Sequence, residues 1–204
     1  MSQAMQPRRW TEEEFFAWLQ HQETKYELVD GQPVPRRAPD PVTGMVGATQ
    51  RHDRVAVNLL VALAGRLRGS PCRPGTSDTA IRIPGRNIRY PDVAVDCGKF
   101  QDAERTATEP VLVAEVLSPS TRDFDQTEKL EEYRTVPTLR YILVIDPMQP
   151  RLLLHTRGAD GHWSAARIAG LEAVAVLPAL GIELTLAELY EGLTFQPLPR
   201  VVDG

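Results

Sequence analysis

Residues 111–117 read Val-Leu-Val-Ala-Glu-Val-Leu, and this stretch decides the fold because it is almost continuously apolar and carries one charge. A run of this length and composition is typical of a central β-strand that is buried on both faces of a sheet. Its single carboxylate, Glu115, is costly to bury unless a cation, a metal or a proton compensates it. The stretch therefore predicts the middle of a sheet and, at the same point, a polar site.

The sequence on both sides of this strand predicts one mixed domain. Periodicity, capping residues and turn dipeptides mark the other elements. They are a helix at 12–20, a hairpin turning at Asp30-Gly31, a loop at 35–47, a helix at 50–68, strands at 79–83 and 88–95, a helix at 125–135, a strand at 141–145, a hairpin of 151–156 with 162–168, and a short helix from Thr185. This order is typical of an α/β (α+β) fold, with a mixed central β-sheet flanked by helices and β-hairpins near both ends. We expect a single domain at 10–195, a poorly ordered N-terminus at 1–9 and a C-terminal tail at 196–204.

Composition and charge limit the classes of function. The 204 residues carry a net charge of −4, which argues against a protein that coats nucleic acid through many Lys and Arg contacts to phosphates. An enzyme whose cationic centre is a bound metal remains possible, because the formal charge does not count the metal. No apolar run approaches the roughly 20 residues of a membrane helix, and the polar N-terminus has no secretory signal. We expect no membrane partner.

The two cysteines, Cys72 and Cys97, lie far apart in the sequence and outside any paired motif. They support neither a disulfide framework nor a zinc cluster. We therefore expect reduced thiols and a cytoplasmic protein.

Three features are polar where the local pattern is apolar. Pro91-Asp92 lies in the middle of the strand expected at 88–95, where a proline removes a ladder donor and forces an edge, a bulge or a bend. Such a bend can aim Asp92 into a cleft. Glu115 is the second feature. The third is Lys129 on the following helix, with Asp125 and Tyr133 one turn away on the same face.

Each of these residues also has a simpler interpretation. Asp92 could cap a turn, Glu115 could pair with an arginine, and Asp125 is well placed as a helix N-cap. Together, however, two carboxylates on adjacent strands and a nearby lysine form a set that suits phosphodiester hydrolysis. Carboxylates bind Mg²⁺, the metal activates a water, and a lysine can position that water or stabilise the phosphoryl group.

Pro91-Asp92 and Glu115, separated by 115 − 92 = 23 residues, resemble the signature of the PD-(D/E)XK nuclease superfamily. Longer stretches resemble one bacterial family of restriction endonucleases within it, and the resemblance covers about residues 26–192. The matching positions are 26–31, His52, 115–121, Asp125, Lys129, Tyr133 and 144–147. The resemblance implies a restriction-endonuclease-like fold. One departure concerns the lysine, because Leu117 stands two residues after Glu115, where the superfamily has its lysine. Lys129, 129 − 115 = 14 residues after Glu115, is expected to take its place from the next helix.

The resemblance also implies the roles of the site residues. Asp92 and Glu115, with the carbonyl of Val116, would hold Mg²⁺ or Mn²⁺, and Lys129 would position the attacking water. Glu27 would be a third acidic residue of the site, although its place beside a hairpin equally suits an exposed strand carboxylate. His52 would lie at the rim of the metal site, and its alternatives are a half-buried histidine with a satisfied hydrogen bond or a surface histidine.

These roles predict a divalent-metal-dependent phosphodiester hydrolase, with DNA as the expected substrate. A nuclease fold without turnover, used for binding or as a scaffold, is one alternative, and a hydrolase of smaller phosphoesters is another. A basic rim around the site would favour nucleic acid. By analogy with nucleases that use two subunits we expect a homodimer, for which the strand from Tyr141 and the apolar C-terminal part are candidate surfaces.

Overall fold

A computed structural model describes residues 8–36, 49–118 and 124–195 of the chain, without the side chains of 124–126. The loop expected at 35–47 and the two expected tails therefore lie largely outside the described residues. The elements are α1 (Glu12–Leu19), β1 (Tyr26–Val29), β2 (Gln32–Pro35), α2 (Gln50–Arg66), β3 (Arg73–Thr76), β4 (Ile81–Ile83), β5 (Asn87–Arg89), β6 (Val93–Asp96), β7 (Pro110–Val116), α3 (Phe124–Thr135), β8 (Tyr141–Asp146), β9 (Arg151–Arg157), β10 (Trp163–Ala169), β11 (Val174–Leu177), the 3₁₀ turn η1 (Pro178–Leu180), β12 (Ile182–Thr185) and α4 (Leu186–Leu189).

The main sheet has six strands in the order β10-β9-β8-β7-β6-β3. Strands β7 and β8 pair in parallel, and every other neighbour in this sheet is antiparallel. Strand β7 lies inside the sheet, as its apolar run predicts, and its side chains alternate between two cores. Leu112 and Ala114 belong to the core on the α2 face, whereas Val113 belongs to the core on the α3 face.

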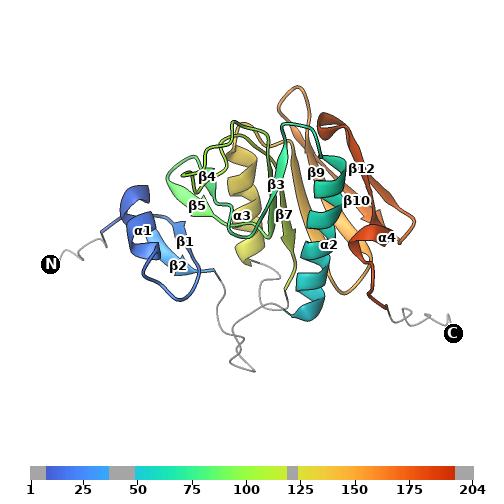
Figure 1. Cartoon of the computed structure of the whole chain (residues 1–204), viewed down its shortest axis with the longest axis horizontal. Coiled ribbons are helices and arrows are strands. Elements are labelled where there is room, and N and C mark those ends of the chain that lie inside the picture. The colour runs from blue at the N-terminus through green and yellow to red at the C-terminus, as the bar shows by residue number, and fades with distance from the viewer. Residues whose placement is uncertain (1–7, 37–48, 119–123, 196–204) are drawn as a thin grey trace.

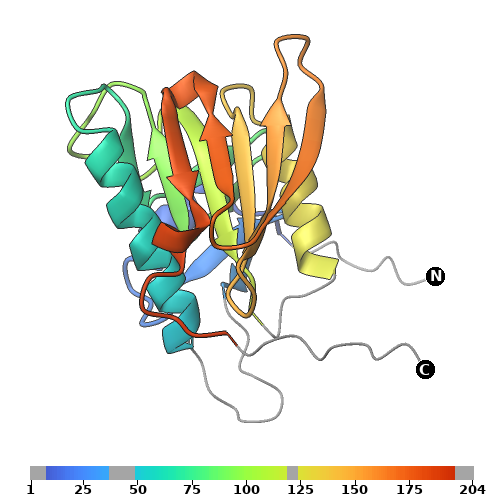
Figure 2. The ribbon, with the colours of Figure 1, turned by 90° about the vertical axis from the view of Figure 1, so that its right-hand side faces the viewer.

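Helices cover both faces of this sheet (Figure 1). The apolar stripe of α2, which includes Val55, Leu59 and Leu63, packs on one face together with β11, β12 and α4. Figure 2 shows the C-terminal hairpin of β11 and β12 in front of the sheet, on the same side as α2. On the other face, Tyr133 of α3 packs against Val113. The observed architecture confirms the predicted mixed sheet flanked by helices, with hairpins near both ends.

A smaller sheet in the order β2-β1-β5-β4 lies beside α1. Its core joins Phe15 of the helix to Leu28 and Ile88 of the strands. The predicted capping box of Thr11 and Glu14 forms at the start of α1, and the Asp30-Gly31 turn joins β1 to β2. This sheet carries Glu27 toward the main sheet.

The strand predicted at 88–95 is two strands. β5 belongs to the small sheet and β6 to the main sheet, with the break at 90–92. The expectation of one continuous strand is wrong, whereas the bend that Pro91 predicts is present. Strands β3, β11 and β12 were not predicted, because they are four residues long and β3 contains a proline and a glycine that obscure a period of two.

The two cysteines form a disulfide between Cys72 and Cys97, so the expectation of reduced thiols is wrong. Pairing of β3 with β6 places Arg73 opposite Asp96, and the next residue outward on each strand is a cysteine. A separation of 25 residues in the sequence does not reveal this pairing. The cytoplasmic location stays a prediction, and no helix within the described ranges is long and apolar enough to cross a membrane.

Of the two surfaces suggested for a homodimer, one is used inside the chain. The strand from Tyr141, β8, pairs with β7 on one side and β9 on the other, so it offers no free edge. In the C-terminal hairpin, Leu177 and Leu184 are buried in the core, whereas Val174 and Val176 are exposed. The strand from Tyr141 is therefore not a free surface, and the C-terminal surface and the homodimer itself stay predictions.

Candidate active site

The predicted site residues meet at the end of the main sheet where β7 ends and where α2 and α3 begin (Figure 1). Antiparallel pairing of Val93 with Ala114 brings Asp92 and Glu115 to the next rung of the ladder. The first turn of α2, capped by the Thr49 side chain, supplies His52. Residues far apart in the sequence are thus placed side by side by strand register and helix position.

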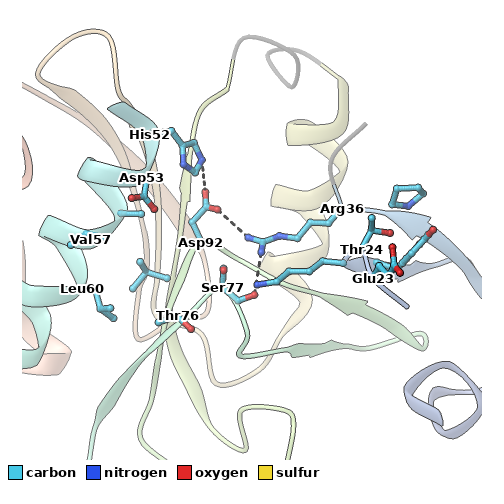
Figure 3. A pocket seen from close by; sticks show the side chains of 15 residues that line it. Glu23, Thr24, Arg36, His52, Asp53, Val57, Leu60, Thr76, Ser77 and Asp92 are labelled. Atoms are coloured by element: carbon cyan, nitrogen blue, oxygen red, sulfur yellow. Dashed lines mark hydrogen bonds and ion pairs between the residues drawn. The ribbon is translucent and has the colours of Figure 1, made fainter. Parts of the chain in front are cut away.

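Asp92 is buried, with 7% of its side chain exposed, and it has a defined partner on each oxygen. Oδ2 accepts a hydrogen bond from the backbone N–H of Val116 at 2.8 Å and lies 3.2 Å from Nε2 of His52. Oδ1 accepts from Nη2 of Arg36 at 3.0 Å (Figure 3). Burial acts to raise the pKa of Asp92, but His52, Arg36 and the Val116 N–H outweigh it and lower the pKa to about 2. Asp92 is therefore an anion at neutral pH.

Glu115 faces α3, which brings two donors to the same oxygen. Nζ of Lys129 lies 2.8 Å from Oε1, and the hydroxyl of Tyr133 donates to Oε1 at 2.8 Å. Burial, with the nearby carboxylates of Asp92 and Glu27, raises the pKa of Glu115 above its ordinary value although Lys129 opposes the shift. The lysine expected from the next helix is thus turned inward, with 17% of its side chain exposed.

Glu27 reaches the site from β1 and is buried, so the alternative of an exposed strand carboxylate is wrong. Oε1 lies 3.1 Å from Nζ of Lys129 and accepts from the N–H of Tyr90, and Oε2 accepts from Arg89 at 3.0 Å. Burial acts to raise the pKa of Glu27, but Lys129 and Arg89 hold it below its ordinary value. Lys129 therefore bridges the carboxylates of Glu27 and Glu115, one from each sheet.

A second set of ion pairs, in which Arg89 joins Glu27 to Glu132, was not predicted. Nε and Nη2 of Arg89 donate to the two oxygens of Glu132 on α3, at 2.5 and 2.8 Å, and Asn87 donates to the same carboxylate. Arg89 follows the ordinary alternation of polar and apolar residues in its strand, so no local signal singled it out. Arg36 was also missed, since it lies in a segment rich in Pro and Arg where no periodicity singles out one residue.

The donor chemistry fits a hard divalent cation, because Glu115 offers carboxylate oxygens from β7 and Asp92 offers them from the position directly before the adjacent strand, β6. Within the described ranges, no group of three or more His, Cys, Asp or Glu side chains could hold a metal ion. A set of two carboxylates suits Mg²⁺, which keeps several waters and takes the substrate's phosphate oxygens. Val116 contributes its N–H to Asp92, and the ligand role of its carbonyl stays a prediction. The side chain of Asp125 lies outside the described residues.

A pocket of about 650 Å³ opens beside Asp92. Figure 3 shows α2, with Val57 and Leu60, on one side of it and the segment with Glu23 and Thr24 on the other. Its charged residues are of both signs: Glu23, Lys25, Arg36, Asp53 and Asp92, together with the imidazole of His52. The described rim is therefore mixed in charge rather than uniformly basic.

The mixed sheet and the carboxylate–lysine site define a protein of the restriction-endonuclease-like class. A family model described as "Putative restriction endonuclease", the Uma2 family, matches residues 12–187. The chain belongs to this family. It is 30% identical over 185 residues to the uncharacterized protein slr1290 of Synechocystis sp., covering 90% of this chain and 92% of that one. Its identity to the uncharacterized protein sll1609 of the same organism is 31% over 160 residues, or 75% and 85% of the two chains.

A solved structure supports the fold. The crystal structure of "a putative nuclease belonging to DUF820" from Anabaena variabilis superposes with a TM-score of 0.67 and covers 88% of this chain and 96% of that chain. Because the two sequences are only 15% identical, this likeness concerns the fold alone.

Proposed function

We propose that the protein is a divalent-metal-dependent endonuclease that hydrolyses phosphodiester bonds in DNA. The observation that carries the proposal is the position of Lys129, whose Nζ lies 2.8 Å from Glu115 while Asp92 directly precedes the adjacent strand, β6. A largely buried lysine and two carboxylates at neighbouring strands are groups that suit metal-assisted phosphoryl chemistry. Membership of a family of restriction endonucleases supports the same reaction.

Asp92 and Glu115 would hold Mg²⁺ or Mn²⁺, with the carbonyl of Val116 as a further ligand. The bound ion would supply positive charge to the phosphate and lower the pKa of a coordinated water. The two carboxylates differ in the direction of their pKa shifts. Asp92 is ionised at neutral pH because of its low pKa, whereas the pKa of Glu115 is raised by burial and by the nearby carboxylates, and a bound cation would act to lower it.

Lys129 would position the attacking water and stabilise charge on the phosphoryl oxygens. Burial acts to lower the pKa of Lys129, but the carboxylates of Glu115 and Glu27 raise it above the ordinary value. The side chain is therefore an ammonium that donates hydrogen bonds and does not serve as a general base. Glu27 would orient it, and the interaction of His52 with Oδ2 would fix the orientation of Asp92.

The experiment is cleavage of plasmid and oligonucleotide DNA in Mn²⁺, Mg²⁺ or EDTA by the wild type, Glu115→Gln and Glu131→Gln. Glu131 lies on α3 and pairs with Arg134 at the surface, so it serves as a matched control. We expect metal-dependent cleavage in the wild type and the control, and a loss of at least about a hundredfold in Glu115→Gln. Cleavage that persists in Glu115→Gln or in EDTA would contradict the proposal.

The two alternatives predict other results in the same experiment. A scaffold protein would bind DNA without cutting it in any metal. A hydrolase of smaller phosphoesters would leave DNA intact and hydrolyse bis(p-nitrophenyl) phosphate in a reaction that Glu115→Gln abolishes. The mixed charge of the described rim keeps both alternatives worth measuring.

A further inference from the structure

We propose that the pocket beside Asp92 binds one unpaired nucleotide of the DNA strand that is cut, so that the preferred substrate is single-stranded or locally unpaired. This inference rests on the proposed function, because it assigns a substrate to the same site. Asp92 is both a lining residue of the pocket and the carboxylate proposed to hold the metal. A strand whose phosphate lies at Asp92 therefore places a neighbouring nucleotide at the pocket.

The size of the pocket supports a nucleotide. Its volume of about 650 Å³ lies in the range of roughly 300–1,000 Å³ that is usual for pockets that bury small organic ligands. A base within an intact duplex is stacked and paired, so it enters a pocket only after it leaves the helix. A single strand offers its bases without that cost.

Apolar side chains line the pocket on two sides, among the charged residues already named, and they come from two different elements. Val57 and Leu60 line it from α2, and Tyr26 and Pro35 line it from the β1–β2 hairpin. Figure 3 shows the helix and the β1–β2 part of the chain on opposite sides of the space. Two apolar walls suit the two faces of a base, and contacts with base faces are largely independent of sequence.

The inner end of the pocket is polar and buried. Arg36 lies there with 8% of its side chain exposed, donating from Nη2 to Asp92 and from Nη1 to the backbone carbonyl of Ser77 at 3.1 Å. A guanidinium is a strong donor to phosphate oxygens. The pocket thus offers apolar walls to a base and a cation to the phosphate beside it.

The net charge of the chain favours a single strand over a coated duplex. With 23 Lys and Arg against 27 Asp and Glu, the chain lacks the excess of cations by which proteins neutralise many phosphates at once. Lys25, at the pocket, is moreover paired with Asp78 at 2.5 Å. Contacts with the face of a base add affinity that phosphate contacts alone, with this balance of charges, would not supply.

The test uses two valines of α2. Val57 is 42% exposed and lines the pocket, whereas Val61 is 64% exposed, lies one turn further along the helix and does not line it. Val57→Trp places a bulky ring in the pocket and narrows it, and Val61→Trp is the matched control with the same change in size at an exposed position. Binding of fluorescein-labelled oligo(dT) and of a blunt duplex of equal length is followed by anisotropy in Ca²⁺, with gels to confirm that the DNA stays intact.

We expect the wild type and Val61→Trp to bind the single strand about tenfold more tightly than the duplex, and Val57→Trp to lose about tenfold in affinity for the single strand, as expected for the lost contact with one base. Circular dichroism confirms that both variants are folded. Equal binding of the two DNAs by the wild type, no binding of the single strand, or equal losses in both variants would overturn the inference.

The experiments distinguish failure of the nucleotide pocket from failure of the endonuclease proposal. If duplex DNA is cut in a reaction that Glu115→Gln abolishes while Val57→Trp has no effect, the endonuclease proposal stands and the nucleotide pocket is wrong. If Val57→Trp selectively weakens single-strand binding but no metal supports cleavage, the pocket stands and the endonuclease proposal is wrong.

Discussion

The backbone N–H of Val116 donates a hydrogen bond to Oδ2 of Asp92 over 2.8 Å, which ties the end of β7 to the residue that precedes β6. The bond holds the Asp92 carboxylate beside the strand that carries Glu115. It also leaves Oδ1 turned toward Arg36. The two carboxylates of the site are therefore fixed relative to one another by the backbone before any ligand arrives.

The low pKa of Asp92 predicts a loss of stability in acid. A carboxylate whose folded pKa is depressed contributes stability above its unfolded pKa, and that contribution is lost as the pH falls through the folded pKa. For Asp92 the window runs from its ordinary 3.8 down to about 2, and the contribution is about 2 kcal/mol. Urea unfolding at pH 7, 4 and 2 should show a wild-type advantage over Asp92→Asn that shrinks toward pH 2. Asp78→Asn, at an exposed ion pair, should not show this trend.

The ion pair between Arg36 and Asp92 predicts that the guanidinium and a metal ion compete for the Asp92 carboxylate. Its guanidinium occupies Oδ1 of Asp92 and places a positive charge where a divalent ion must approach. Arg36→Gln should therefore bind Mn²⁺ more tightly than the wild type, by about three- to tenfold, in isothermal titration. Arg82→Gln, at an exposed ion pair with Glu12, is the control and should leave affinity unchanged. Weaker binding in Arg36→Gln would show that Arg36 supports the metal site instead.

The position of Lys129 between two carboxylates predicts that its replacement lowers the rate of DNA cleavage without preventing metal binding. Lys129→Met keeps the length of the side chain and removes the ammonium between Glu115 and Glu27. Mn²⁺ binding should persist, because the carboxylates lose a competing cation, while the rate of DNA cleavage should fall by about a hundredfold or more. Lys99→Met, at an exposed position, should retain the wild-type rate. If Lys129→Met cleaves DNA normally, the lysine has no role in the reaction.

The raised pKa of Glu115 predicts that metal binding weakens in mild acid. The proton competes with the metal for this carboxylate, so Mn²⁺ affinity should be constant above the raised pKa and fall about tenfold per pH unit below it. Because the pKa lies above the ordinary 4.5, the decline should begin at a higher pH than for an ordinary glutamate. Titrations from pH 8 to 4 measure this. A profile that stays flat down to the ordinary 4.5 would contradict the assignment of Glu115 as a ligand.

The disulfide predicts a stability that depends on redox conditions. Closing a loop of 25 residues between Cys72 and Cys97 is expected to contribute about 3 kcal/mol. Thiol titration of the unfolded, unreduced protein should find no free thiol, and dithiothreitol should lower the melting temperature. The Cys72→Ala/Cys97→Ala variant should melt like the reduced wild type and be insensitive to dithiothreitol. Two free thiols in freshly purified protein would contradict the pairing.

The central strand, the helices and the turns were predictable because each has a local signal. The run around Glu115 identified β7, and the Asp30-Gly31 pair identified the first hairpin. The lysine on α3 was also predicted, and the structure places it beside Glu115. Short strands such as β3 and β12 were not predicted, because a run of four residues gives too little periodicity to identify a strand.

Contacts between residues that are far apart in the sequence could not be predicted in the same way. Arg36 meets Asp92 from 56 residues away, and Arg89 meets Glu132 from 43 residues away. Such pairs depend on how two sheets and a helix dock, and no local pattern encodes that arrangement. The disulfide was missed for the same reason, since it depends on the register of β3 against β6.

The break at Tyr90-Pro91-Asp92 passes the chain from the small sheet to the main one, and Lys129 then joins a carboxylate of each sheet. The proposed catalytic set therefore spans residues 27–129 and is complete only when both sheets and α3 have docked. A chain in which only one of the two sheets has formed would carry these carboxylates without the geometry to use them. Separation of the two sheets should therefore remove Glu27 from Lys129 while Glu115 keeps its place on β7.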